Sequence, residues 1–330
     1  MKNVLWLLCC MCTMQVMAQT PYNATPEMLF GDTTRIGLPF AKDPYVIKWN
    51  KRYLMYYTIP AHKDTAHPVK GWGIGIAESK DLTHWVKIGE MVPEADYEKK
   101  GFCAPSVLVI KKVVHLFYQT YGNGTRDAIC HATSTDGIHF TRNATNPIFR
   151  PTGKWTCGRA IDAEVVAFND RYYLFFATRD PAYSIQMQGV AATKNLQTNF
   201  NRGEWSLLAD SSIMKPELAW EGKCVEAASI LVRGKQMFMF YAGNYNNAPQ
   251  QIGVAKSTDG VQWKRLSVDP FLPVGAKGTW NASESGHPHI FKDDDGKTYL
   301  FYQGNNTKGR TWNLSKVEVK WNDVGPYLVK

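Results

Sequence analysis

The fold is decided by a pattern that is plainest in residues 162–178, which read DAEVVAFNDRYYLFFAT. A short apolar run leads into a polar turn, and a second run closes on aromatic side chains. Short apolar runs that are bounded by turn residues and rich in β-branched and aromatic residues predict strands. The segment therefore predicts a hairpin of two buried strands.

Four other segments repeat this pattern: DPYVIKWNKRYLMYYT (43–58), APSVLVIKKVVHLFYQT (104–120), EAASILVRGKQMFMFYAG (226–243) and HPHIFKDDDGKTYLFYQG (287–304). One or two residues before the end of each repeat stands a closing aromatic residue, and these five are Tyr57, Tyr118, Phe176, Tyr241 and Tyr302. They are separated by 61, 58, 65 and 61 residues. A near-constant step of this size indicates an array of similar structural units.

A weaker hairpin pattern follows the first one, as in AICHATSTDGIHF (128–140) and IGVAKSTDGVQW (252–263). The turns Asp136-Gly137 and Asp259-Gly260 carry the residues that a positive φ demands. Each unit is thus about four strands long, and no segment predicts a long amphipathic helix. We predict an all-β fold, a five-bladed β-propeller, with residues 19–330 as a single domain. A pair of β-sandwiches fits the regular spacing less well.

The N-terminus predicts an export signal. Lys2 precedes an apolar run that ends in Val16-Met17-Ala18, so we expect a signal peptide at residues 1–18 and a secreted or periplasmic mature chain. No later stretch approaches the roughly 20 apolar residues that a membrane-spanning helix needs. Four cysteines follow the signal, and they either form disulfides or remain free as buried thiols: Cys103, Cys130, Cys157 and Cys224.

The charge points away from nucleic acid as a partner. The chain has 38 basic and 29 acidic residues, a net charge of +9. The basic residues form short scattered clusters such as Lys99-Lys100, without a stripe of interleaved aromatic residues. A solvated basic surface or an acidic polysaccharide ligand fits this distribution better.

Equivalent residues of the repeats predict a shared site. The first strand of each blade lines the channel of a propeller, so residues at its start converge on the axis. Counted back from the closing aromatic residues, with one residue of slack, they are Asp43, Ala104, Asp162, Glu226 and His287. Carboxylates are seldom buried without a partner or a function, and paired carboxylates across a cleft are the groups that hydrolyse glycosides.

Three tryptophans lie six or seven residues ahead of the last three of these positions: Trp155, Trp220 and Trp280. A tryptophan in a loop often serves only as a hydrophobic plug. Their matched offsets favour a substrate-binding rim on which the faces of sugar rings pack.

The residues that open the five blades carry a family resemblance: Asp43-Pro44, Ala104-Pro105, Ile161-Asp162, Glu226-Ala227 and Gly286-His287. With the signal and the repeats, they resemble glycoside hydrolase family 43 and its five-bladed relatives over residues 39–304. The resemblance implies that Asp43 is the general base and that Glu226 is the general acid of an inverting mechanism. It also implies that Asp162 tunes the pKa of this acid and orients it. It implies that His287 binds substrate and also serves a structural calcium ion, either as a ligand or through water. It implies no other cofactor.

Two departures from the family pattern affect the expected substrate contacts but leave the three acids in place. Ser106 stands where the family often has aspartate, and Ala228-Ser229 replaces a usual Pro-His. Other groups remain alternatives for the acid. They are Glu217, Glu221 and Glu284, and also His287 or His289, because a fifth-blade histidine is thought to take this role in the related neoagarobiose hydrolases.

The expected function is hydrolysis at the chain end of a plant or algal polysaccharide fragment, similar to that of arabinofuranosidases and xylosidases. An oligosaccharide or polysaccharide is the expected partner, and loops 61–71 and 245–250 are expected to set its identity. Two enzymatic alternatives are a neoagarobiose hydrolase-like enzyme and a glycoside phosphorylase that binds phosphate through Arg159, Lys223 and Arg310. A carbohydrate-binding propeller without catalysis is the non-enzymatic alternative.

Overall fold

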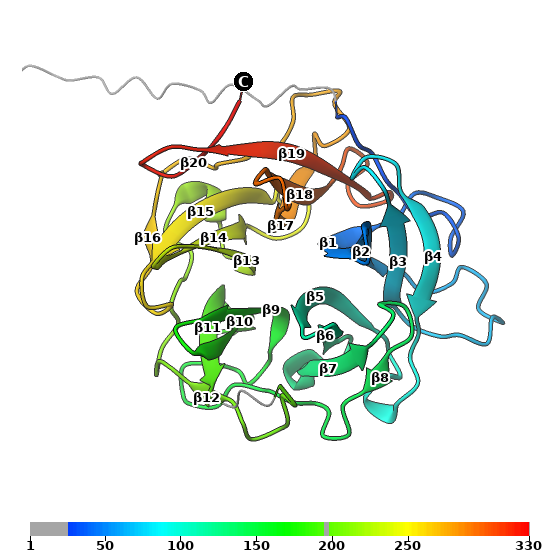
Figure 1. The fold of residues 1–330 in the computed structure, drawn as a ribbon, viewed down its shortest axis with the longest axis horizontal. Coiled ribbons are helices and arrows are strands. Elements are labelled where there is room, and N and C mark those ends of the chain that lie inside the picture. The colour runs from blue at the N-terminus through cyan, green and yellow to red at the C-terminus, as the bar shows by residue number, and fades with distance from the viewer. Residues whose placement is uncertain (1–25, 195–197, 330) are drawn as a thin grey trace, which may run out of the picture.

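The computed structural model describes residues 26–194 and 198–329, so the predicted signal peptide lies outside the described residues. These residues form five four-stranded antiparallel sheets, which follow one another in chain order around a central axis (Figure 1). The prediction of an all-β, five-bladed β-propeller is confirmed. The innermost strands of neighbouring blades contact each other, and the last of them returns to the first.

The blades are bounded as follows. Blade one contains β1 (Lys42–Trp49), β2 (Arg52–Ile59), β3 (Gly73–Ser79) and β4 (Val86–Met91). Blade two contains β5 (Phe102–Ile110), β6 (Val113–Thr120), β7 (Ile129–Ser134) and β8 (Thr141–Arg142). Blade three contains β9 (Ile161–Phe168), β10 (Arg171–Arg179), β11 (Gln186–Thr193) and β12 (Ser206–Leu207). Blade four contains β13 (Val225–Arg233), β14 (Gln236–Gly243), β15 (Gln251–Ser257) and β16 (Lys264–Arg265). Blade five contains β17 (Glu284–Lys292), β18 (Thr298–Asn305), β19 (Asn313–Trp321) and β20 (Pro326–Leu328). Three short 3-10 helices precede or connect strands: η1 (Asp96–Glu98), η2 (Gly124–Arg126) and η3 (Ala219–Glu221).

The hydrophobic core lies between the blades. Each blade packs face to face against the next, so the second strand of a blade is covered on both sides. Its sequence is therefore a continuous apolar run and does not alternate between apolar and polar residues. The closing aromatic residues are all buried, at 0 to 2% exposure: Tyr57, Tyr118, Phe176, Tyr241 and Tyr302. Burial of such a side chain stabilises the fold by about 1.5–3 kcal/mol.

The segment before blade one closes the ring. Phe30 and Leu314 of β19 exchange backbone hydrogen bonds of 2.9 and 2.8 Å. The backbone of Trp312 likewise donates to Pro39 and accepts from Ala41. Met28 and Ala41 belong to the apolar cluster between blades five and one. The chain thus fastens its last blade to its first with residues that precede β1.

Three smaller predictions can be compared with the structure. Gly137 and Gly260 both have φ of +78°, as the predicted turns require. The four cysteines that lie within the described residues are free, and three of them are buried. No helix within residues 26–194 and 198–329 is long and apolar enough to span a membrane.

Candidate active site

The inner strands share a backbone irregularity at their first residues. In each blade the pairing register of the first two strands shifts there, as it does at a β-bulge. One residue in each shift adopts a left-handed conformation with φ between 42° and 53°: Asp43, Ala104, Asp162, Ala227 and His287. Such a conformation costs a non-glycine residue roughly 1–3 kcal/mol, so the surrounding contacts must stabilise it.

The preceding blade supplies these contacts. In four of the five blades the left-handed residue donates its backbone N–H to a side chain of the blade before it. These hydrogen bonds are Asp43 to Gln303 (3.0 Å), Ala104 to Thr58 (2.8 Å), Asp162 to Gln119 (2.6 Å) and His287 to Gln250 (3.0 Å). The blade-to-blade contacts therefore fix the backbone from which the site is built.

The register of blade four differs from the prediction. Glu226 was expected at the repeat position of Asp43 and Asp162, but Ala227 occupies the left-handed position and Glu226 precedes it by one residue. The one residue of slack in the sequence count concealed this offset. Glu226 nevertheless faces the same pocket, because the bulge changes the direction of the side chains beside it.

A pocket of about 220 Å³ lies at this end of the channel and brings the predicted groups together. Asp43, Asp162, Glu226 and His287 all line it, and the three acids are 6 to 7% exposed. A larger cavity of about 540 Å³ lies elsewhere, against β7 and β8, and no carboxylate lines it. The central pocket is therefore the candidate active site.

Asp43 has the environment of an ionised carboxylate. Burial alone would raise its pKa, but His287 and Lys42 outweigh burial and hold the pKa below its ordinary value. Nδ1 of His287 lies 3.1 Å from Oδ1 of Asp43. An ionised carboxylate in a pocket can accept a proton from water, as a general base does.

Glu226 and Asp162 have the opposite environment. Burial raises the pKa of Glu226, and burial together with the charge of Glu226 raises the pKa of Asp162. Because the two carboxyls interact, they titrate as a pair, and the pair retains a proton to a higher pH than an exposed acid does. The pocket thus combines one carboxyl whose pKa is lowered with two whose pKa is raised, the separation of base from acid that glycoside hydrolysis requires.

Two glutamine amides orient Glu226. Gln250 donates from Nε2 to Oε1 of Glu226 at 2.7 Å, and Gln186, the first residue of β11, donates to Oε2. The amide oxygens are also engaged, since Gln250 accepts from the backbone of His287 and Gln186 accepts from Arg159 and Arg179. The orientation of both amides is therefore fixed, with each NH₂ group facing the acid.

The predicted tryptophan rim does not line the pocket. The indole rings of Trp155, Trp220 and Trp280 lie against glycine residues of the second or third strands of their blades. A Cβ atom at Gly189, Gly243 or Gly304 would lie 2.8, 2.3 or 2.7 Å from these rings. The matched offsets of the three tryptophans thus reflect packing within the blades. The aromatic walls of the pocket are Trp72, Tyr121 and Tyr245.

The three alternative glutamates are engaged in other contacts and do not line the pocket. Glu221 accepts hydrogen bonds from Tyr241 at 2.8 Å and from Arg265 at 2.7 Å, and Glu217 also binds Arg265. Glu284 accepts from Gln303 at 2.7 Å.

Of the two alternative histidines, His287 lines the pocket beside Asp43, whereas His289 lies below it. His289 stacks on Tyr45 with ring centroids 3.8 Å apart, and burial lowers its pKa to about 3.

The channel beneath the pocket is filled by polar side chains, among them both serines at which the sequence departs from the family pattern. Glu164 accepts hydrogen bonds from Ser106 at 3.0 Å and from the backbone of Ile230 at 2.9 Å. Ser229 lies 3.5 Å from Nδ1 of His289. The departures thus contribute to the floor of the pocket.

The calcium ion expected at His287, which would serve it as a ligand or through water, stays a prediction. Calcium takes six to eight oxygen ligands. Throughout residues 26–194 and 198–329, no group of three or more His, Cys, Asp and Glu side chains could hold a metal ion. His287 is instead placed beside Asp43, and we derive no step through a metal.

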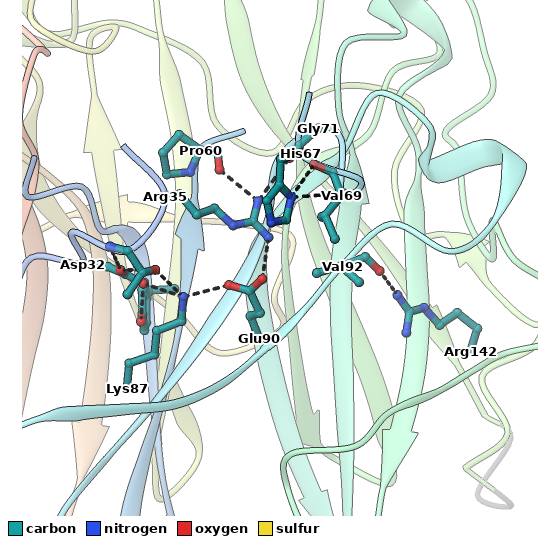
Figure 2. A network of polar contacts seen from close by, with 12 residues as sticks. Asp32, Arg35, Pro60, His67, Val69, Gly71, Lys87, Glu90, Val92 and Arg142 are labelled. Carbon is teal, nitrogen blue, oxygen red and sulfur yellow. Dashed lines mark hydrogen bonds and ion pairs between the residues drawn. The ribbon is translucent and has the colours of Figure 1, made fainter. Parts of the chain in front are cut away.

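A network around Arg35 supports one wall of the pocket (Figure 2). The buried guanidinium of Arg35 donates to the carbonyl oxygens of Pro60 at 2.9 Å and Gly71 at 3.1 Å, and it binds Glu90 at 3.2 Å. Pro60 and Gly71 are the two ends of the loop that leads to Trp72. The segment before blade one therefore holds this loop closed and positions Trp72.

The sequence did not predict several lining residues. Of the three basic residues named for phosphate, Arg159 lines the pocket, whereas Lys223 and Arg310 do not. Arg179, Gln186 and Lys42 line it without having been predicted. Tyr245 belongs to a loop that the sequence named as a specificity loop, and that position was the one signal available for it.

Comparisons with known proteins agree with this geometry. The model of the family "Glycosyl hydrolases family 43" matches residues 36–325. No curated protein matches the chain. Solved structures with a similar fold include a thermostable family-43 glycoside hydrolase, at 19% identity and a TM-score of 0.68, with 91% of this chain and 96% of that chain covered.

Two further solved structures have similar scores. An endo-1,4-beta-xylanase from Bacteroides thetaiotaomicron is 23% identical, with a TM-score of 0.68 and coverage of 89% of this chain and 95% of that chain. An alpha-L-arabinofuranosidase from Lactobacillus brevis is 18% identical, with a TM-score of 0.67 and coverage of 88% and 95%. At these identities the likeness concerns the fold.

Proposed function

The chain belongs to glycosyl hydrolase family 43 and is a glycosidase that hydrolyses O-glycosyl bonds, and from this premise we propose that it is a secreted or periplasmic, exo-acting, inverting enzyme. Its substrates are fragments of plant or algal polysaccharides. The names of the similar structures support a pentose-containing substrate, such as one carrying arabinofuranosyl or xylosyl units.

The observation that carries the proposal is the contrast between Asp43 and Glu226 within one small pocket. Their pKa values move in opposite directions, which separates a base from an acid. In the proposed step, Asp43 removes a proton from water as the water oxygen attacks the anomeric carbon. Glu226 gives its proton to the glycosidic oxygen as the bond to that oxygen breaks. The configuration of the anomeric carbon is inverted.

Asp162 tunes the acid in this mechanism. It shares the buried environment of Glu226, and the two carboxyls disfavour each other's ionised form. Gln186 and Gln250 hold the carboxyl of Glu226 in a fixed orientation, which keeps the proton donor aligned with the leaving oxygen.

Exo-action is supported by the floor of the pocket. Tyr45, Ser106, Glu164 and His289 fill the channel below it, so a polysaccharide chain has no passage through the axis. A pocket of about 220 Å³ with a closed floor suits the terminal sugar of a chain better than an internal one.

The test is a panel of aryl glycosides and arabino- and xylo-oligosaccharides with the wild type, Asp43→Asn and Glu226→Gln. We expect release of a terminal sugar by the wild type and its loss in Asp43→Asn. Proton NMR of the first product formed should show the inverted anomer. Full activity of Glu226→Gln on substrates with poor leaving groups would contradict the assignment of the acid.

Export is tested separately by N-terminal sequencing of protein recovered from a native-like host. We expect a chain that begins near Gln19. A chain that retains residues 1–18 in the cytoplasm would contradict the proposal of export.

A further inference from the structure

One side of the pocket carries two guanidinium groups that the proposed hydrolytic step does not use. Arg159 precedes β9 and Arg179 ends β10, so blade three supplies both. Nη1 of Arg159 and Nε of Arg179 approach the same oxygen, Oε1 of Gln186, at 3.4 and 3.2 Å. Because Gln186 also donates to Glu226, the two guanidinium groups lie one amide away from the proton donor.

Neither guanidinium makes a close ion pair within the described residues. Nε of Arg159 lies 3.7 Å from Asp127, a long ion pair, and has no hydrogen-bond partner. Arg179 makes no ion pair with any residue in the described part of the chain. Its guanidinium lies between the rings of Tyr183 and Tyr245, at 5.6 and 5.2 Å from their centroids.

Four other buried or partly buried cations have acidic partners. Carboxylates lie 3.2, 3.3 and 2.7 Å from Arg35, Arg142 and Arg265. Lys42, on the wall of the same pocket, is influenced by Asp43 and Glu284. Arg179 differs from these four cations because its half-buried guanidinium has no carboxylate partner among the described residues and lines the pocket. A planar fork of N–H donors binds a carboxylate through two parallel hydrogen bonds.

We propose that the pocket recognises an acidic sugar, whose carboxylate binds Arg179 with help from Arg159 beside the leaving group. The inference rests on the proposed glycosidase function and specifies its substrate class as glycosides that carry a uronic acid unit. Cation–π contacts with the rings of Tyr183 and Tyr245 restrain the guanidinium at the pocket. Gln186 fixes the distance between the bound anion and Glu226.

The direct test compares uronic acid-containing oligosaccharides with the same oligosaccharides after chemical reduction of their carboxyl groups to alcohols. Binding is measured by calorimetry on Asp43→Asn, which removes the proposed base, so a missing turnover does not obscure the result. We expect the acidic form to bind at least about tenfold more tightly, since a hydrogen bond to a charged group contributes about 1.5–3 kcal/mol. The difference should shrink as salt is added.

Variants of Arg179 test the residue itself. In Arg179→Gln the preference for the acidic form should vanish, and in Arg179→Lys it should persist in part. Arg233→Gln is the matched control, because Arg233 also lies over an aromatic ring, at 4.2 Å from the centroid of Trp321, but outside the pocket. It should bind both forms as the wild type does.

Two outcomes would overturn the inference. The first is equal binding of the acidic and the reduced oligosaccharides. The second is product release that requires inorganic phosphate, because phosphate would then be the anion that Arg159 and Arg179 bind. Tight binding of the acidic form to Asp43→Asn, without hydrolysis by the wild type, would instead support the anion site and contradict the proposed function.

Discussion

Two groups of buried acids in this propeller have different surroundings. Between the blades, each acid accepts a hydrogen bond from a closing tyrosine and lies beside a cation, and we name these the blade acids: Asp32, Glu98 and Glu221. Their tyrosine bonds measure 2.9, 2.6 and 2.8 Å, and Lys87, Arg142 and Arg265 lie 3.1, 3.3 and 2.7 Å away. We name the acids of the pocket the pocket acids: Asp43, Asp162 and Glu226.

The pocket acids receive a different set of partners. Glu226 is held by neutral amides, and Asp162 faces Glu226. The pKa of Asp32 and of Glu221 is lowered despite burial, whereas that of Asp162 and of Glu226 is raised. A carboxylate in an ion pair stabilises the packing of blades, whereas a buried carboxyl held by neutral amides or facing another acid has a raised pKa. Burial alone therefore does not separate the blade acids from Asp162 and Glu226, but the side chain in direct contact does. Asp43, which lies beside His287, resembles the blade acids in this respect.

The largest expected effect is on catalysis by a pocket acid. Glu226→Gln should lower kcat/KM by about 10²- to 10⁴-fold on substrates with poor leaving groups, because a general acid contributes a factor of that size. The loss should be smaller for aryl glycosides whose leaving group needs no proton. Thermal denaturation should show no loss of stability. A strong destabilisation with catalysis retained would place Glu226 among the structural acids.

The mirror-image experiment removes a blade acid. Glu221→Gln should lower the free energy of unfolding by about 3 kcal/mol, since breaking a buried ion pair leaves a charge uncompensated. Catalytic constants should change little. Glu217→Gln is the control, because Glu217 binds the same arginine with a half-exposed carboxylate, and it should cost less than about 1 kcal/mol.

The pH dependence of stability has a defined sign for this pair. The pKa of Glu221 in the fold lies below its ordinary value of 4.5, so its contribution is present above that value. It is lost as pH falls through the lower pKa of the folded state. In urea denaturation, the free energy of unfolding of the wild type should therefore decline below about pH 4.5. The decline should be smaller for Glu221→Gln.

A smaller effect is expected from the amide that orients the acid. Gln186→Ala removes a donor to the ionised form of Glu226, so the pKa of Glu226 should rise. The alkaline limb of the kcat/KM profile should move to higher pH, and kcat/KM at its optimum should fall about tenfold. Gln236→Ala, at the start of β14, serves as a control outside the pocket. A fall in activity with an unmoved alkaline limb would contradict a positioning role.

The smallest effect concerns the base. His287 is the main charge that holds the pKa of Asp43 down. In His287→Ala that pKa should rise, and the acid limb of the kcat/KM profile should move up by about one pH unit. An acid limb unchanged from the wild type would contradict the influence of His287 on Asp43.

The sequence predicted the architecture well, because each blade repeats the same apolar runs and closing aromatic residues. The acids were predictable for the same reason, since the repeats place Asp43 and Asp162 at one position. Glu226 was assigned one residue out of register, because hairpins of unequal length leave the count from the closing aromatic residues ambiguous. No linear signal marks a bulge that changes the direction of a side chain.

The partners of the acids were not predictable. Gln186 comes from blade three but donates to Glu226 of blade four, so the contact depends on how two blades pack, and Arg179 reaches Glu226 only through Gln186. The tryptophans misled for a related reason. Trp155, Trp220 and Trp280 recur at matched offsets because each blade needs a ring over a glycine, and packing within a blade repeats as regularly as a functional site does.

The most direct test of the contrast between the two regions is infrared difference spectroscopy of the carboxyl groups at pH 7. The account predicts that the wild type shows the carbonyl band of a protonated carboxyl that Glu226→Gln loses, and that Glu221→Gln leaves the band unchanged. A band that Glu221→Gln removes and Glu226→Gln retains would contradict it.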